Sequence, residues 1–389
     1  MKRYDVIVIG AGLAGLQCAR LLAGRGVRVL LADRKLSLAD GIHTTGIFVR
    51  RTLEDFNFPE GCLGTPVRHV TLYSPARRVM HLESEHDEFR VGRMAKLYKH
   101  YLEECVNAGA EWSPATRYAG RESAGADSLI RFETEGTRWT ARTRYLVGGD
   151  GARSRVAQDL KLDSNNEWIV GVEEVYENVP LEGSPRFHCF LDPRIAPGYL
   201  AWVVHDGEET HIGVGGYAKQ FDALRALEIF RLSVDGSIID LSRAHRVERR
   251  GGRIPVGGVL RRIANRRGLL IGDAAGAVSP LTAGGLDPCM RLSSLAARVI
   301  PVYLSSGDAA ELAPYSGNAF RARFTSRLWM RRIIAQLKQP ALLEAACAAL
   351  RLPLVNSLAW HVFFGRGSFP DAETTSEKME KAMIEMKRA

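Results

Sequence analysis

A glycine triplet separates an apolar strand from a helix at the start of the chain. Residues 4–9, YDVIVI, form a β-branched apolar run that suits a parallel strand buried on both faces. Residues 16–23 then place apolar side chains at helical spacing, and a second apolar run at 27–32 ends on Asp33. The turn between strand and helix is Gly10-Ala11-Gly12-Leu13-Ala14-Gly15. This order predicts a dinucleotide-binding unit, with a glycine-rich turn of another α/β fold as the alternative.

Each residue of this unit has a physical role. Gly10 permits the tight turn, Gly12 lets the backbone approach a pyrophosphate, and Gly15 lets the helix pack closely on the strand. The start of the helix offers free N–H groups and the positive end of its dipole to phosphates. Asp33 stands where a carboxylate can accept hydrogen bonds from a ribose. The triplet by itself does not distinguish FAD from NAD.

The composition and charge of the chain indicate which classes of binding partner to expect. The chain has 389 residues, of which 46% are apolar, and a formal net charge of +9. We therefore expect anionic partners, which include a phosphorylated cofactor, an acidic substrate or a membrane surface. The arginine-rich stretch 243–267 predicts a solvated rim and no nucleic-acid partner, since no nucleic-acid motif accompanies it. Six scattered cysteines without a Cys-x-x-Cys pair favour reduced thiols, no metal site and a cytoplasmic protein. No apolar run is long enough to predict a membrane span.

Two later segments favour FAD. Residues 269–277, LLIGDAAGA, and residues 146–156, LVGGDGARSRV, each join a strand to small residues at an aspartate, Asp273 and Asp150. Together with the triplet they resemble the three FAD motifs of the flavoprotein superfamily that includes aromatic hydroxylases and geranylgeranyl reductases. The resemblance implies that Asp273 holds the ribityl chain and that Asp150 turns beside the pyrophosphate. A helix starting near Gly285 would direct its N–H groups at the flavin.

The same resemblance extends the set of cofactor-binding residues. An arginine at a helix start reaches FAD in this superfamily, and Arg93 stands at the start of a helix that we expect to end near Gly109. The strand near Tyr118 would pass the adenine. An exposed arginine at a helix start is the alternative for Arg93. The remaining residues that the resemblance assigns to FAD are Arg34, Thr44, Thr45, Gly46, Pro280, Gly284, Gly285 and Leu286.

These motifs predict an α/β plus β fold with a discontinuous Rossmann-like FAD-binding domain. We assign residues 1–60, 90–160 and 265–330 to it. Residues 61–89 and 161–264 form an antiparallel-sheet substrate domain, with Asp206-Gly207 as a hairpin turn. Residues 331–389 form a helical C-terminal region. Substrate should bind between the sheet and the flavin.

Residues 196–216, APGYLAWVVHDGEETHIGVGG, resemble the substrate-domain segment of geranylgeranyl reductases. Tyr199 and Trp202 would line a prenyl tunnel, although they are three residues apart where that family has two, and His205 replaces its proline. Core packing is the alternative for Trp202. His43 or Thr44 occupies the position of the family's cysteine. This makes His43 a candidate proton donor, with a merely hydrogen-bonded loop histidine as the alternative.

The sequence thus predicts an FAD-dependent oxidoreductase that reduces a carbon–carbon double bond of an isoprenoid or other hydrophobic small molecule. His43, Tyr199 and Trp202 are the candidate catalytic residues, and NADPH or another reductant would act as a transient electron donor. A monooxygenase acting on an aromatic or polyketide and a non-redox cyclase or isomerase are the alternatives. The stretch 321–336 mixes arginines with apolar residues and predicts peripheral membrane contact, with packing against the FAD domain as the alternative.

Overall fold

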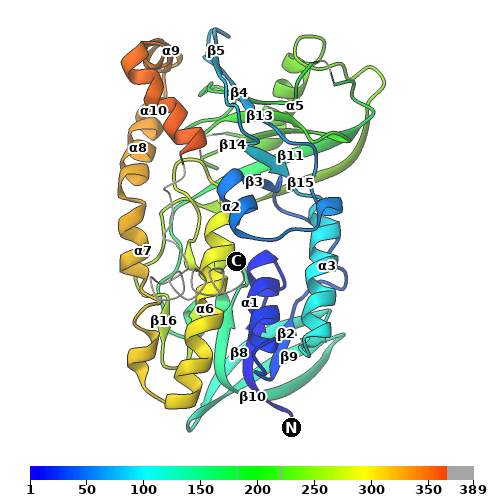
Figure 1. Cartoon of the computed structure of the whole chain (residues 1–389), viewed down its shortest axis with the longest axis vertical. Helices are drawn as coiled ribbons and strands as arrows, with labels where there is room; N and C mark the ends of the chain where they lie inside the picture. The colour runs from blue at the N-terminus through cyan, green and yellow to red at the C-terminus, as the bar shows by residue number, and fades with distance from the viewer. Residues whose placement is uncertain (182, 220, 366–389) are drawn as a thin grey trace, which may run out of the picture.

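The computed structural model describes residues 1–181, 183–219 and 221–365. Two large sheets lie at opposite ends of an elongated molecule, the first in the lower half of Figure 1 and the second in the upper half. A group of C-terminal helices runs along one side and reaches both halves. The segment 366–389, which belongs to the predicted helical C-terminal region, lies outside the described residues.

The first sheet has eight strands and a parallel centre in the order β16-β17-β10-β1-β2-β7, where only the edge strand β16 runs antiparallel. Strands β8, β9 and β10 form an antiparallel meander, and β10 belongs to both the meander and the parallel centre. Val6, Ile7 and Val8 on β1 are fully buried, because helices cover one face and the meander the other. The strands are β1 (Arg3–Ile9), β2 (Val29–Ala32), β7 (Glu111–Ser113), β8 (Thr116–Ala124), β9 (Asp127–Thr134), β10 (Thr137–Gly148), β16 (Ala264–Asn265) and β17 (Gly268–Leu270).

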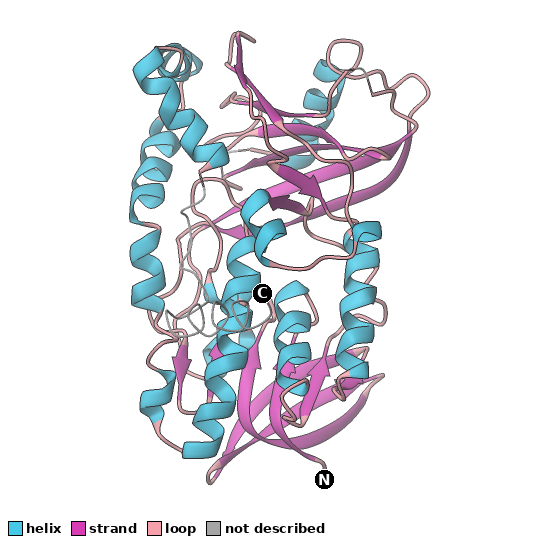
Figure 2. Ribbon diagram, in the orientation of Figure 1, coloured by secondary structure: helices cyan, strands magenta, loops and turns pink. Residues whose placement is uncertain are grey.

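Three helices pack together beside this sheet, with α1 between α3 and α6. The predicted helix after the triplet is confirmed and begins at Leu13, and the predicted starts after Arg93 and Gly285 are also confirmed. Figure 2 shows the helices standing on one side of the sheet. The helices of this half are α1 (Leu13–Ala23), α2 (Arg50–Asp55), α3 (Met94–Asn107), α4 (Arg155–Asp159) and α6 (Leu286–Ser306), with 3-10 turns η1 (Glu60–Cys62), η2 (Gly272–Ala275) and η3 (Ala309–Leu312).

The second sheet has seven strands in the order β15-β11-β14-β13-β12-β4-β5. The Asp206-Gly207 turn joins β13 to β14, as predicted. The pairing is antiparallel except between β12 and β4, which run parallel. β4 enters this sheet before the chain returns to the first sheet, and β12 joins it only after the chain has come back. One helix, α5 (Ala223–Val234), packs on β11 and β14. The strands are β4 (His69–Tyr73), β5 (Val79–Leu82), β11 (Trp168–Glu177), β12 (Arg186–Phe190), β13 (Ala201–His205), β14 (Glu209–Gly216) and β15 (His245–Pro255).

A small ladder and the C-terminal helices connect the two halves. Strands β3 (Ile47–Val49) and β6 (Phe89–Val91) pair where the chain passes between the sheets. The C-terminal helices are α7 (Gly317–Arg323), α8 (Thr325–Gln336), α9 (Pro340–Leu350) and α10 (Pro353–Phe364). Within the described ranges, no single helix is long and apolar enough to cross a membrane. The bent pair α9–α10 passes that test only when its two helices are taken together.

Candidate functional site

A cavity of about 1230 Å³ lies between the two sheets and extends to the C-terminal helices. Single-ligand sites usually enclose about 300–1,000 Å³, so this space can hold a large cofactor and a second molecule. The cavity brings together most of the residues that the sequence predicted. Those that line it are Gly10, Gly12, Ala14, Asp33, Arg34, His43, Thr44, Thr45, Tyr118, Asp150, Tyr199, Trp202, Asp273, Gly284, Gly285 and Leu286.

Four of the predicted cofactor residues do not line the cavity: Gly15, Gly46, Arg93 and Pro280. Gly15 serves packing, because a Cβ there would lie 1.8 Å from the Gly10 carbonyl oxygen. Gly46 has a φ of +86°, which glycine adopts without strain. The Arg93 guanidinium pairs at 2.6 Å with Glu208, on the hairpin of the second sheet. Arg93 thus does not line the cavity, and its role toward the cofactor stays a prediction.

The glycine turn forms one end of the cavity. The Asp33 carboxylate accepts hydrogen bonds from the backbone N–H groups of Ala11, at 2.6 Å, and Lys35, at 2.8 Å, and so fixes the end of β2 to the turn. A Cβ on Gly12 would meet no atom within 4 Å, so the space in front of this residue is open. No side chain caps α1 at Gly12. Its first N–H groups are thus available to an anion.

The Asp150 carboxylate builds the neighbouring turn. It accepts hydrogen bonds from the Ser154 hydroxyl at 2.6 Å and from the backbone N–H groups of Arg155 at 2.7 Å and Val156 at 3.1 Å, and so satisfies the first turn of α4, whose N-cap is Ser154. Both of its oxygens are therefore engaged within the protein. Arg153 and Arg155 line the cavity beside it and bring positive charge to the end where the glycine turn lies.

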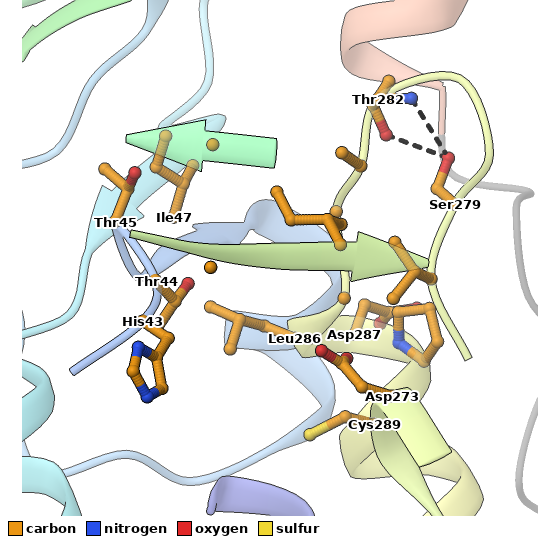
Figure 3. A pocket seen from close by; sticks show the side chains of 18 of the residues that line it. His43, Thr44, Thr45, Ile47, Asp273, Ser279, Thr282, Leu286, Asp287 and Cys289 are labelled. Atoms are coloured by element: carbon orange, nitrogen blue, oxygen red, sulfur yellow. Dashed lines mark hydrogen bonds between the residues drawn. The ribbon is translucent and has the colours of Figure 1, made fainter. Parts of the chain in front are cut away.

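Asp273 lies on the opposite wall, in η2. Figure 3 shows it near Leu286 and Cys289, across the pocket from His43, Thr44 and Thr45. Among the described residues no protein group donates a hydrogen bond to its carboxylate, and burial raises its pKa to about 6. Helix α6 begins at the same wall and has no side-chain cap at Gly285. This wall therefore offers an acceptor and free N–H groups to a ligand.

The loop before α6 is tied to both the second sheet and the C-terminal helices. The Tyr199 hydroxyl donates to the Thr282 carbonyl oxygen at 2.7 Å, and Arg327 donates to the Ser279 hydroxyl at 3.0 Å. Thr282 in turn bonds to Ser279 (Figure 3). Burial raises the pKa of the Tyr199 phenol. Tyr199 is thus better suited to holding this loop than to donating a proton.

Glycines of β14 make room for the aromatic wall of the cavity. A Cβ on Gly213 would lie 2.2 Å from the Trp202 ring, and one on Gly215 would lie 2.6 Å from the Tyr199 ring. The two rings therefore lie against bare backbone, with Trp202 buried in the protein and facing the cavity. Trp202 packs in the core, as in the alternative reading, and also lines the predicted substrate space.

His43 is exposed, and its Nδ1 lies 2.9 Å from the Gly251 carbonyl oxygen. A buried residue that the sequence reasoning missed lies nearby. Glu173 on β11 accepts hydrogen bonds from Thr45 and from the Trp202 indole, the latter at 3.0 Å. The sequence did hold a signal for this residue. Glu173 and Glu174 lie inside the mostly apolar strand WIVGVEEVYE, and carboxylates are almost never buried without partners, so a polar partner could have been expected there.

The other end of the cavity is apolar and is formed by α8 and α10. Ile333 and Leu358 line it and are also exposed on the surface, at 60% and 47%. Three arginines of the predicted membrane stretch do not face outward. Arg321 and Arg327 donate to protein groups, and Arg331 is buried between the Tyr199 and Tyr217 rings. On α8, Arg327 thus contacts the loop before α6 and Arg331 contacts tyrosines beside the second sheet, while Trp329, Arg332 and Ile333 remain exposed.

Comparisons with known proteins agree with this geometry. Residues 3–200 match the family model described as FAD binding domain. The chain is 26% identical over 317 residues to a digeranylgeranylglycerophospholipid reductase from Methanocaldococcus jannaschii, with 79% of each chain covered. Among solved structures, a geranylgeranyl bacteriochlorophyll reductase-like protein from Thermoplasma acidophilum superimposes with a TM-score of 0.80 and 21% identity, covering 89% of this chain and 90% of that one. A p-nitrophenol 4-monooxygenase from Pseudomonas putida gives 0.72 and 16%, covering 93% and 98%.

Proposed function

The chain belongs to the FAD-binding-domain family, and from this premise we propose that it is a flavin-dependent reductase of carbon–carbon double bonds in isoprenoid chains. Its class, an FAD-dependent oxidoreductase, follows from the family and the relatives. The finer reaction rests on the cavity. Its polar end has the groups that FAD needs, and its other end is an apolar space that continues to the surface between α8 and α10.

The residues present fit FAD. The open space at Gly12 and the uncapped start of α1 suit the pyrophosphate, with Arg153 and Arg155 adding positive charge. Each Asp33 oxygen keeps a lone pair for a ribose hydroxyl after accepting its backbone N–H group. The Asp273 carboxylate, which has no protein donor among the described residues, suits the ribityl hydroxyls. The uncapped N–H groups of α6 would face a flavin edge that becomes negative on reduction.

Bound and reduced, FAD supplies a hydride, with NADPH or another reductant as the source of its electrons. The chain's own residues would place the alkene and exclude water. Trp202 and Tyr199 form one wall beside the Gly284–Leu286 loop, and the apolar side chains of α8 and α10 continue the space outward. A polyisoprenoid can follow this path because apolar groups line it from the loop to the surface.

An anaerobic assay tests the reaction. Holoenzyme reduced with dithionite is mixed with geranylgeraniol or with vesicles containing a digeranylgeranylglycerophospholipid. We expect the flavin to be reoxidised without oxygen and the product to gain two mass units for each bond reduced. A saturated chain of equal length is the control and should leave the flavin reduced.

Monooxygenation is the second candidate, favoured by the fold shared with the p-nitrophenol 4-monooxygenase. The same enzyme, given oxygen and a phenol, would then consume oxygen and add sixteen mass units to the product. If the reduced flavin is not reoxidised by the isoprenoid without oxygen, and the phenol is oxygenated when oxygen is present, the monooxygenase proposal would replace the reductase proposal.

We also propose that the substrate enters from an anionic membrane surface at α8–α10. Exposed apolar side chains lie on these helices or on the link between α9 and α10, with Arg323 and Arg332 exposed on α7 and α8. Cosedimentation with anionic liposomes at low salt, weakened in the double variant Trp329→Ser and Ile333→Ser, is the expected result. Equal binding by wild type and variant would contradict this entry route. The apolar residues concerned are Trp329, Ile333, Leu342, Leu352, Leu358 and Trp360.

A further inference from the structure

The second sheet buries a row of ionisable side chains directly behind the cavity wall. Glu173 on β11, His211 on β14 and Asp206 beside the hairpin are exposed by only 3%, 1% and 1%. Burying charged groups is costly unless they are paired, so a row of this kind in a small space requires an explanation. The FAD-binding contacts described above use none of these three residues.

The row runs from the cavity to the surface. At the cavity, the first Glu173 oxygen accepts from the Thr45 hydroxyl and the Trp202 indole, and both donors line the cavity. The second Glu173 oxygen lies 3.3 Å from His211 Nδ1. Beyond the ring, His211 Nε2 lies 3.9 Å from carboxylate oxygens of both Asp206 and Glu209.

Glu209 brings the row to solvent, because its side chain is 32% exposed. His211 Nε2 has no hydrogen-bond partner within the usual distance in the described part of the chain, although it is buried. A modest movement of either acid would close that gap, since a hydrogen bond needs about 2.7–3.2 Å. The ring nitrogens of His211 thus connect a surface carboxylate to a carboxylate on the cavity wall.

The charges around His211 favour its protonated form. Burial lowers the pKa of His211, but the negative charges of Asp206 and Glu173 and the hydrogen bond to Glu173 outweigh it and raise the pKa to about 9. Burial likewise raises the pKa of Glu173, while the charge of His211 and the bonds from His211 and Thr45 hold it below its usual range. The other charged groups facing this pair are Glu209 and, from β15, Arg250, whose Nη1 lies 3.6 Å from Glu173.

We propose that Glu209, Asp206, His211, Glu173 and Thr45 form a proton relay that carries a proton from solvent to the substrate in the cavity. The inference rests on the proposed reductase function and names its proton source. The π bond of the alkene breaks, one carbon takes the hydride supplied by the reduced flavin, and the other takes the Thr45 hydroxyl proton. Before this step His211 passes its Nδ1 proton to the Glu173 carboxylate and takes another proton from solvent through the two surface acids. The neutral Glu173 carboxyl group then turns its proton towards Thr45, and Thr45 receives that proton as its own hydroxyl proton passes to the carbon, which leaves Glu173 ionised again.

This assignment replaces His43 as the proton donor. His43 is exposed, and its Nδ1 is engaged with the Gly251 carbonyl oxygen. Glu173 lies on the cavity wall and has a route by which its proton is replaced. Glu173 and His211 act through Thr45, so they are positioning and relay residues, and their test needs a readout that a purely structural role would leave unchanged.

The chain offers a matched control one residue away. Glu174 is also buried on β11 but bonds to Tyr176, Arg246 and Arg249, away from His211. Dithionite-reduced holoenzyme of Glu173→Gln, Glu173→Asp and Glu174→Gln is mixed anaerobically with geranylgeraniol in H2O and in D2O. We expect Glu173→Gln to slow flavin reoxidation by about 10²–10⁴-fold, the usual range for a lost proton donor. Glu173→Asp should recover part of the rate, and Glu174→Gln should stay within a few-fold of wild type.

The solvent isotope effect identifies the role. Wild type should react more slowly in D2O, and His211→Gln should flatten the fall in rate that wild type shows as pH rises through 9. Flavin content and the flavin absorbance spectrum should not change in any variant. Reoxidation of Glu173→Gln at the wild-type rate with the wild-type isotope effect would overturn the relay and leave the reductase proposal intact.

A measurement on the oxidised holoenzyme judges the relay without any substrate. NMR of labelled histidine should show His211 protonated at pH 7.5 and losing its proton near pH 9, and Glu173→Gln should lower that value. A neutral His211 at pH 7, or one divalent metal ion bound per chain at Asp206, Glu209 and His211, would overturn the relay. If these results are as expected but wild type reduces no isoprenoid, the reductase proposal fails and the proton path stands as a feature of the fold.

Discussion

The two sheets of this molecule make opposite use of their strands. In the first sheet β2, β17 and the Val6–Ile9 part of β1 are apolar and buried, and the exposed pair Lys2 and Glu111 lies beside the first residues of β1 and β7. At its glycine turn the functional groups are backbone N–H groups and open space, and carboxylates such as Asp33 and Asp273 stand only where strands end. In the second sheet, β11 and β14 bury Glu173 and His211, and its functional groups are side chains. The difference shows two ways of building one cavity. The first half uses backbone at a glycine turn and side chains at strand ends, whereas the second half uses ionisable side chains buried within its strands.

The two halves should differ in the substitutions that they tolerate. A site made of backbone depends on close approach, so it is broken by added atoms. A site made of buried ionisable side chains depends on mutual pairing, so it is broken by removing one partner. Substitutions that add atoms at glycines or remove a charge in each half test this difference.

The largest effect is expected at Gly15. In Gly15→Ala the new Cβ would lie 1.8 Å from the Gly10 carbonyl oxygen, and backbone on both sides cannot yield without losing the turn. We expect a loss of at least about 3 kcal/mol of unfolding free energy and no bound flavin. Gly12→Ala is the control, because no atom lies within 4 Å of its Cβ. Its apoprotein should melt like wild type while binding FAD less tightly. Equal melting temperatures for the two variants would refute the packing role of Gly15.

The next effect concerns Asp273 and has opposite signs in the apoprotein and the holoenzyme. Because folding raises this carboxyl pKa from 3.8 to about 6, its ionised form destabilises the apoprotein. The cost is absent below about pH 4, grows between pH 4 and 6 and is complete above that, at about 1–3 kcal/mol. Asp273→Asn should therefore stabilise the apoprotein at pH 7.5 but not at pH 4.

The same substitution should weaken FAD binding by about 1–3 kcal/mol, since a charged acceptor for ligand hydroxyls is lost. Chemical denaturation at the two pH values and flavin titration measure the two effects. An apoprotein of unchanged stability together with unchanged FAD affinity would mean that Asp273 faces neither a desolvated wall nor the cofactor.

The smallest effect on stability is expected at Gly213. In Gly213→Ala the Cβ would meet the Trp202 ring at 2.2 Å, but a side chain can move where backbone cannot. We expect a loss of about 1 kcal/mol, the low end for overpacking, with normal flavin content. Movement of the indole should lengthen its 3.0 Å bond to Glu173 and slow substrate reduction. Tryptophan fluorescence and the anaerobic assay check both points, and a variant with faster turnover would contradict the role given to the wall.

The sequence predicted the dinucleotide end well because the signals there are local. Gly10, Gly12 and Asp33 lie within one βαβ unit, so their arrangement follows from a single strand, turn and helix. Asp273 required a resemblance as well, since it lies far along the chain. For Arg93, the local sequence predicted the helix start but not the partner of the side chain. That partner, Glu208, comes from a distant hairpin and was not visible in the local pattern.

The sequence alone therefore determined the cofactor and the class of fold. Only the tertiary structure decided which buried side chains meet. Glu173, His211 and Thr45 come from three separate segments, and only the pairing of β11 with β14 and the passage of the 43–46 loop over the sheet bring them into contact. Strand periodicity says that a residue faces inward. Which group it meets there depends on register and on the connections between strands, and these are set by the packing of the whole chain.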